Sequence, residues 1–229
     1  MISFFIFLLW LKSLQYPANS RSMEEYHSAN VTEDNHYIFF DGKEDKGTIL
    51  FQGGALVEVQ AYSFLAEELS QKGYDVYLLK ALFNLPILNQ NAAQSLIQEK
   101  NLTRVFLAGH SLGGTMSATA AKTNPAVQGL ILLASYPSDD TDLSQEKIRV
   151  LSITASEDKV LRQSKYKEAK NRLPKSTSYQ IIEGGNHAGF GLYGPQKGDG
   201  KALITLMEQQ DRTYHLILDF LESQSVPLS

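Results

Sequence analysis

Apolar and polar positions along this chain form short blocks in which strand-like and helix-like patterns alternate. Short runs of apolar and β-branched residues predict strands, and several runs are apolar on both faces, as buried parallel strands are. The runs are HYIFF (36–40), GTILFQ (47–52), YDVYLLK (74–80), RVFLAG (104–109), VQGLILLAS (127–135), IRVLSITAS (148–156) and YQIIEGG (179–185). The charged turn between the first two runs predicts a hairpin or two neighbouring strands.

Helical spacing of apolar residues fills the intervals between these runs. In 59–73, Tyr62, Leu65 and Leu69 share one face, and Gly73 is placed to end the helix. Further helices are predicted over 89–100, 115–123, 158–173 and 201–223. The alternation predicts an α/β fold with a mostly parallel central sheet and helices on both faces. Ligands in such folds bind outside the carboxyl ends of the strands.

The length and composition indicate one folded domain. A chain of 229 residues lies within the range of single α/β domains, and 43% hydrophobic with 20% charged residues is typical of a folded protein. We assign residues 36–229 to this domain, residues 21–35 to a polar linker and residues 1–20 to an apolar N-terminal segment.

The N-terminal segment contains a nearly unbroken apolar run, ISFFIFLLWL (2–11), which Lys12 follows. Ten residues are too few to cross a bilayer core, which takes roughly 20. The run is interpreted either as a signal peptide, with small residues for cleavage at 18–20, or as a buried N-terminal helix or strand. We favour a signal peptide or membrane anchor, with membrane contact through residues 2–11. We therefore expect a membrane-associated or exported protein rather than a cytoplasmic one.

Charge and cysteine content exclude several classes of partner and site. The net charge is −4, from 21 basic and 25 acidic residues, and no block of Lys or Arg is present, so nucleic acid is not an expected partner. The absence of cysteine excludes disulfides, thiolate metal sites and cysteine nucleophiles.

The pentapeptide GHSLG (109–113) fits the G-x-S-x-G pattern of a nucleophile elbow, with a predicted strand before it and a predicted helix after it. Gly109 and Gly113 lack a Cβ, and a strained strand-to-helix turn around Ser111 needs that freedom. The alternative is a phosphate-binding or merely tight turn, but no Lys-Ser/Thr pair and no G-x-G-x-x-G pattern accompanies it. Ser111 is therefore the candidate nucleophile.

A serine nucleophile needs a histidine base and an acid that orients it, in the chain order Ser, Asp or Glu, His. His187 lies in a Gly-rich loop after a predicted strand, whereas His215 lies in a helical pattern and is assigned to structure. Glu157 and Asp158 both follow a buried strand. We choose Asp158 as the acid; its alternative role is the N-cap of the next helix.

An oxyanion hole requires two backbone N–H donors near the nucleophile. Leu112, directly after Ser111, supplies the first. The second is expected from the QGGA loop (52–55), where Gly54 is the favoured donor and Ala55 the alternative. This chemistry needs no metal and no organic cofactor.

A long Gly-rich loop, GFGLYGPQKGDG (189–200), directly follows the candidate base. Its Phe190 and Tyr193 either line the acyl or alcohol pocket or pin the loop to the protein surface. The chain has few other long connections at the expected mouth, so little or no lid is predicted.

Four motifs together carry a family resemblance: GHSLGG (109–114), ASEDKV (155–160), GGNHAGFG (184–191) and the QGGA loop. From residue 36 to about residue 222 the chain resembles the α/β-hydrolase superfamily. Residues 52–79 and 184–200 are similar to small bacterial hydrolases of the fold-5 group, which is related to the dienelactone hydrolase branch.

The resemblance implies Ser111 as nucleophile, Asp158 as acid and His187 as base, with Gly54 and Leu112 as oxyanion donors. Two positions depart from the pattern. Dienelactone hydrolases proper use a cysteine nucleophile, which is absent here, and Gln52 stands where the superfamily usually has histidine before the first glycine.

The expected activity is that of a serine hydrolase, which cleaves small-molecule carboxylic esters of small to medium acyl groups through an acyl-enzyme at Ser111. The apolar N-terminus motivates one alternative, a lysophospholipase or thioesterase acting at a membrane. A second alternative is a non-catalytic ligand sensor on a hydrolase fold, because a fold does not determine a function.

Overall fold

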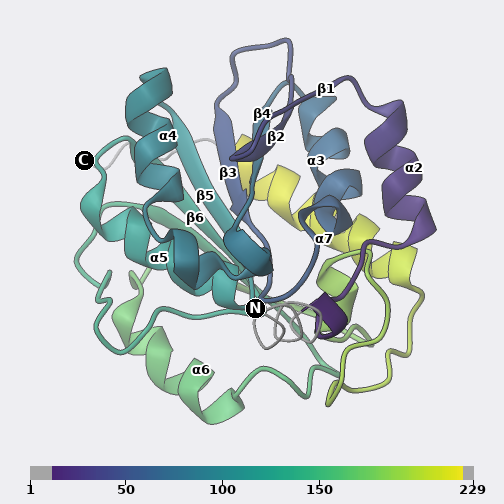
Figure 1. The fold of residues 1–229 in the computed structure, drawn as a ribbon. Helices are drawn as coiled ribbons and strands as arrows, with labels where there is room; N and C mark the ends of the chain where they lie inside the picture. Colours follow the sequence, from purple (N-terminus) through teal and green to yellow (C-terminus); the bar gives the residue numbers. More distant parts are fainter. Residues whose placement is uncertain (1–11, 224–229) are drawn as a thin grey trace, which may run out of the picture.

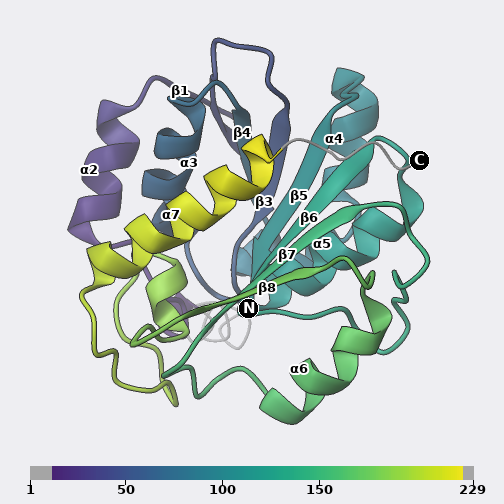
Figure 2. The ribbon, with the colours of Figure 1, turned by 180° about the vertical axis from the view of Figure 1, so that it is seen from behind.

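A sheet of eight strands forms the centre of the molecule, and helices cover both of its faces (Figures 1 and 2). The computed structural model describes residues 12–223. Its strands are β1 (Val31–Glu33), β2 (Tyr37–Phe40), β3 (Thr48–Gln52), β4 (Asp75–Leu79), β5 (Val105–His110), β6 (Val127–Leu133), β7 (Arg149–Ala155) and β8 (Ser178–Ile182). The order across the sheet is β1-β2-β4-β3-β5-β6-β7-β8, in which β2 is antiparallel to both of its neighbours, β1 and β4, and all other neighbouring pairs are parallel.

Helices pack on the sheet in two layers. They are α2 (Ser20–Ser28), α3 (Ser63–Ser70), α4 (Ala92–Lys100), α5 (Leu112–Thr123), α6 (Gln163–Ala169) and α7 (Leu206–Glu222), with short 3-10 turns at Val59–Tyr62, Leu82–Asn84, Pro86–Asn89, Lys170–Arg172 and Ala188–Phe190. Helices α3 and α7 cover one face, with α2 outside α3, and α4 and α5 cover the other (Figures 1 and 2). The predicted α/β class and the mostly parallel sheet are confirmed.

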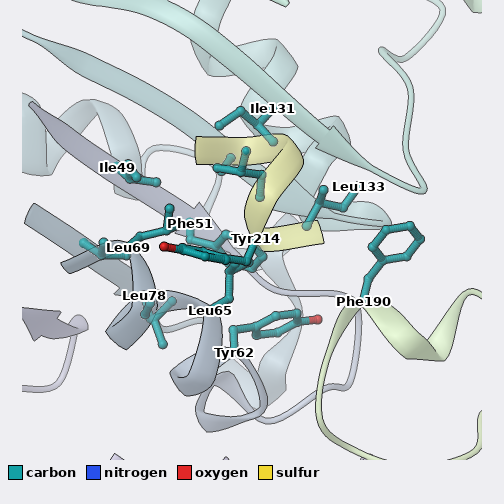
Figure 3. Close-up of a cluster of buried hydrophobic side chains, with 14 of the residues drawn as sticks. Ile49, Phe51, Tyr62, Leu65, Leu69, Leu78, Ile131, Leu133, Phe190 and Tyr214 are labelled. Carbon is teal, nitrogen blue, oxygen red and sulfur yellow. The ribbon is translucent and has the colours of Figure 1, made fainter. Parts of the chain in front are cut away.

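Two apolar cores lie on opposite faces of the sheet, because successive strand residues point to opposite sides. On β3, Ile49 and Phe51 join the core under α3 and α7, whereas Leu50 joins the core under α4 and α5. Figure 3 shows the first core, in which Tyr62 and Leu65 of the α3 region face these strands. Full burial of one such side chain stabilises the fold by about 1.5–3 kcal/mol relative to exposure.

The pairing of the first predicted strands corrects one expectation. β2 and β3 are neither a hairpin nor neighbours, because β4 lies between them, antiparallel to β2 and parallel to β3. The turn between two strands has local sequence signals, but the partner of each strand is decided by which apolar faces meet across the sheet.

Residues 21–35 are not the linker that their polar composition predicted. They contain most of α2 and the edge strand β1. The side chain of Asn19 caps α2 by accepting from the Ser22 amide at 2.9 Å, and the Ser22 hydroxyl donates to Gln60 O at 2.5 Å. Ser22 is the one buried residue of α2, and most residues of this helix are polar, which is why its composition was read as that of a linker.

The connection after the carboxyl end of β8, residues 183–205, is long, and the one helical element in it is the 3-10 turn Ala188–Phe190. Residues 134–148, between β6 and β7, contain no helix. Within residues 12–223, no helix is long and apolar enough to cross a membrane. The apolar run 2–11 lies outside the described residues, and its role as signal peptide or anchor stays a prediction.

Candidate active site

Ser111 occupies a sharp turn between β5 and α5, with φ 53° and ψ −121°. Non-glycine residues rarely adopt such a conformation, which costs of order 1–3 kcal/mol and persists only where the surroundings hold it. Close backbone packing provides that constraint. A Cβ on Gly109 would lie 2.5 Å from Gly113 C, and a Cβ on Gly113 would lie 2.1 Å from Gln52 O. Glycine is therefore required on both sides of the serine.

Asp158 and His187 meet at the same edge of the sheet, after β7 and β8. His187 Nδ1 donates to Asp158 Oδ2 at 2.9 Å, and the two residues are only 1% and 6% exposed. Asp158 Oδ1 accepts from the amides of Val160 and Leu161, both at 2.8 Å. This carboxylate is thus held on both oxygens, and the imidazole is held in one orientation.

The other acid and the other histidine lie elsewhere. Glu157 is partly buried and accepts from the hydroxyl of its exposed neighbour Ser156. His215 is exposed on α7, with Nδ1 next to Asp211 O at 2.8 Å. The alternative role of Asp158 was the N-cap of the next helix. Asp158 does accept from backbone amides, but these amides belong to the turn that precedes α6. That helix begins later, at Gln163.

The hydrogen bond between serine and histidine is not made in this structure. Within residues 12–223, His187 Nε2 is buried and has no hydrogen-bond partner, so it does not contact Ser111 Oγ at bonding distance. The ring of His187 packs on His110, with centroids 4.6 Å apart, and His110 directly precedes the serine. Hydrogen bonds between nucleophile and base are often long until a substrate is bound.

The hydrogen bonds of the loop after β3 argue against Gly54, the favoured candidate for the second oxyanion donor. The Gly54 amide donates to Tyr62 Oη at 2.8 Å and is not free. The Ala55 amide makes no hydrogen bond within the part of the chain that the structure describes. Leu112 is the first residue of α5, where an amide has no partner in its own helix. Of the three candidate donors named from the sequence, Ala55 and Leu112 are therefore the two that remain candidates.

A buried pair, His110 and Tyr62, was missed from the sequence. His110 Nδ1 lies 2.9 Å from Tyr62 Oη, the same hydroxyl that accepts from Gly54. Burial, and then the neighbouring His187, lower the pKa of His110 well below its usual range, and burial raises the pKa of Tyr62. Both groups are neutral at physiological pH. The position of His110 inside G-x-S-x-G could have marked it as a residue next to the site. Its partner Tyr62 could not be found in this way, because Tyr62 lies in a 3-10 turn 48 residues earlier in the chain.

Phe190 and Tyr193 are buried, so their rings do not line an open substrate pocket in this structure. Phe190 is completely buried in the core of Figure 3. Their ring centroids lie 5.8 and 6.3 Å from that of His110. A hollow of about 470 Å³ next to this loop is lined by residues such as Asn186 and Gln209, and by neither aromatic ring. The two rings hold the loop against the elbow.

Residues 12–19, which we call the N-terminal strap, lie against the β3 loop. Tyr16 donates its amide to Leu56 O at 2.8 Å and accepts from the Glu58 amide at 3.0 Å. The Ala18 amide donates to the Glu58 carboxylate at 3.0 Å, and the Asn19 amide to Leu192 O at 2.7 Å. The strap therefore connects the β3 loop with the loop that follows His187.

The described residues contain no group of three or more His, Cys, Asp or Glu side chains that could hold a metal ion.

Comparison with known families decides the classification. Residues 47–211, well over half of the chain, match the model of the alpha/beta hydrolase family. The chain belongs to this family. The resemblance seen in the four motifs is thereby confirmed, and the fold is similar to that of solved α/β hydrolases.

Solved α/β hydrolases share the fold of this chain at low sequence identity. An α/β hydrolase enzyme from a metagenome of lagoon sediments at Mar Chica, Morocco, is 16% identical, with a TM-score of 0.63 over 83% of this chain and 97% of that one. Carboxylesterase CesB of Bacillus subtilis is 11% identical, with a TM-score of 0.60 over 89% and 98%. A dienelactone hydrolase from Anabaena variabilis is 16% identical, with a TM-score of 0.58 over 83% and 95%. Comparison with curated proteins gives no match.

Proposed function

We propose that this α/β hydrolase is a serine hydrolase that cleaves carboxylic esters of small to medium acyl groups. The proposal rests above all on the buried hydrogen bond between Asp158 and His187, at the sheet edge where the Ser111 elbow also lies. An imidazole oriented by a buried carboxylate next to a strained serine is the arrangement that acyl transfer to serine requires. The carboxylesterase among its structural neighbours has the chemistry that we propose here.

In the proposed reaction, Ser111 Oγ attacks the ester carbonyl carbon while His187 Nε2 takes the hydroxyl proton. The free Nε2 must therefore come within hydrogen-bond distance of Oγ. Asp158 stabilises the imidazolium through Nδ1. The amides of Ala55 and Leu112 donate to the carbonyl oxygen as it becomes negative. Nε2 then protonates the departing alcohol, and a water molecule, deprotonated by the same nitrogen, releases the acid from Ser111.

The test is hydrolysis of a short-chain aryl ester by Ser111→Ala and His187→Ala. Each variant should lose about 10³-fold or more in kcat while keeping its thermal unfolding transition. His215→Ala, which removes the other downstream histidine, should keep wild-type turnover. A fluorophosphonate probe should label the wild-type protein and not Ser111→Ala. An unlabelled, inactive wild-type protein would instead favour a non-catalytic ligand sensor.

Lysophospholipids and acyl thioesters are a second substrate class. The position of the strap supports them, because Lys12, the residue that follows the apolar run 2–11, lies in the segment that contacts the β3 loop. Comparing kcat/KM for a short aryl ester, a lysophospholipid and an acyl thioester separates the two proposals. A preference for the aryl ester of more than about tenfold, which equals 1.4 kcal/mol, would favour the first.

A further inference from the structure

Two adjacent glutamines in the first half of α7, Gln209 and Gln210, are buried beside the loop that follows β8 (Figure 2). Each is only 1% exposed. Glutamine is mostly a surface residue, and burying its amide without hydrogen-bond partners is costly. The partners of these two amides therefore indicate what the buried glutamines do.

The side chain of Gln209 binds the backbone of the residue directly before the candidate base. Its Oε1 accepts from the Asn186 amide at 2.9 Å, and its Nε2 donates to Asn186 O at 2.7 Å. A side-chain amide carries an acceptor and a donor in one plane, so it can bind both backbone groups of one residue at once. The two bonds fix the backbone of Asn186 and, through it, the direction in which the chain enters His187.

Two glycines of the base loop leave room for this amide. A Cβ on Gly189 would lie 2.0 Å from Gln209 Oε1, and a Cβ on Gly185 would lie 2.7 Å from the same atom. A side chain at either position would therefore displace the Gln209 amide from Asn186. Gln210 adds a bond to the same loop, because its Nε2 donates to Gly189 O at 2.7 Å.

Asp199 holds the backbone on the other side of the base. Its Oδ2 accepts from the Ala188 amide at 2.8 Å, and its Oδ1 accepts from the Lys159 amide at 3.3 Å. Ala188 directly follows His187 in the chain, and Lys159 directly follows Asp158. One carboxylate thus joins the base loop to the turn that carries the acid, and the backbone is held both before and after His187.

We propose that Gln209 is a positioning residue for the hydrolase reaction proposed above, on which this inference rests. Its amide holds the backbone of Asn186 so that the imidazole of His187 stays at the Ser111 elbow, and Asp199 supports the same placement from the other side. Gln209 acts through the backbone of its neighbour and not on the reacting atoms. The effect on turnover is nevertheless large, because misplacing a catalytic group by about 1 Å can cost about 10²-fold in rate.

The test replaces Gln209 by methionine, which has a similar length and no amide, in the full-length chain. Thr213→Val is the matched control, because Thr213 is buried one turn later on α7 and its hydroxyl donates to Gln209 O, at 2.8 Å, within the helix. With a short-chain aryl ester, Gln209→Met should lower kcat by about 10–100-fold and keep KM within about threefold. Thr213→Val should keep kcat within about twofold. Equal losses in the two variants, or none in Gln209→Met, would overturn the proposal.

A second variant, Gln209→Glu, decides the question if Gln209→Met does not fold. Its carboxylate still accepts from the Asn186 amide but no longer donates to Asn186 O. The loss in kcat should therefore be smaller than in Gln209→Met but still exceed about threefold, again with KM nearly unchanged. Wild-type kcat in a folded Gln209→Glu protein would overturn the proposal.

A nuclear magnetic resonance measurement tests the placement of the base without turnover. The Nδ1 proton of His187, which Asp158 holds, should give a downfield signal that exchanges slowly with water. Gln209→Met should speed this exchange by about tenfold or more, and Thr213→Val should not. A wild-type protein that shows this difference but cleaves no ester would disprove the proposed function and keep the positioning role. Ester cleavage with wild-type kcat and exchange in Gln209→Met would do the reverse.

Discussion

The carboxyl edge of the sheet has two halves that are built differently. The loops after β5, β7 and β8 bring Ser111, Asp158 and His187 to this edge, and short hydrogen bonds hold both carboxylate oxygens of Asp158 and Nδ1 of His187. The other half consists of the strap, the β3 loop and the segment after β4. Its exposed side chains include Leu82, Ile87 and Leu88, so we call it the apolar half, and Leu56 and Phe83 there have φ of 64° and 56°.

The difference shows that the sequence predicts the two halves to a different extent. In the polar half, each candidate residue lies in its own short motif directly after a strand. In the apolar half, three segments that are distant in sequence hold one another through backbone hydrogen bonds. His110 lies between the halves, packed on His187 and bonded through Tyr62 to the Gly54 amide.

The largest expected effect concerns the polar half and follows from replacing its carboxylate. Asp158→Asn should lower kcat/KM for an aryl ester by about 10³–10⁴-fold, because a neutral amide no longer stabilises the imidazolium. The remaining carbonyl oxygen still accepts from the amides of Val160 and Leu161, so the fold should be kept. Glu157→Gln is the matched control and should stay within about twofold of the wild type. A residual activity above about a tenth in Asp158→Asn would remove Asp158 from the mechanism.

An intermediate effect is expected where the two halves meet. Tyr62→Phe removes the hydroxyl shared by the Gly54 amide and His110 Nδ1 and leaves both buried groups unpaired. The free energy of unfolding in urea should fall by about 1–3 kcal/mol. If the β3 loop also loses its position, kcat should fall by about tenfold with little change in KM.

Tyr214→Phe is the control for this prediction. Tyr214 belongs to the same core, and its hydroxyl makes no hydrogen bond in the described part of the chain, so the expected cost is below about 0.5 kcal/mol. Equal unfolding free energies for the two variants would show that the hydroxyl of Tyr62 does not join the halves.

The smallest effect is a pH dependence that comes from His110. Its pKa in the folded protein is lowered, first by burial and then by His187, whereas the unfolded chain has the ordinary value of about 6.5. The unfolded state therefore binds more protons below that pH. Stability is fully present above about pH 6.5 and should fall by up to about 1.4 kcal/mol per pH unit as the pH decreases.

Urea unfolding of the wild type and of His110→Gln between pH 7 and pH 5 measures this contribution. The slope should be smaller in the variant by up to about 1.4 kcal/mol per pH unit. His215→Gln, which removes an exposed histidine, should keep the wild-type slope. Identical slopes in all three proteins would mean that His110 titrates in the folded state as it does in the unfolded chain.

The predicted elements agree with the structure where an apolar pattern is long and directly followed by turn residues. The strands from β3 to β8 and the helices between them arise where the sequence places them. For β3 to β7, burial on both faces leaves a continuous apolar run, whereas the edge strand β8 is partly exposed. α2 and β1 were not predicted. α2 consists mostly of polar residues and buries only Ser22, and β1 is a three-residue edge strand, so neither contains the apolar run on which the sequence prediction relied.

Sequence by itself determined the fold class, the family and the candidate residues Ser111, Asp158 and His187, because each depends on a short stretch of chain whose conformation is local. Only the tertiary structure decided that the Gly54 amide binds Tyr62, that Phe190 and Tyr193 are buried, and that the strap lies against the β3 loop. These contacts join residues far apart in sequence. Which of them form depends on how neighbouring strands and loops pack, and no single segment of the chain carries that information.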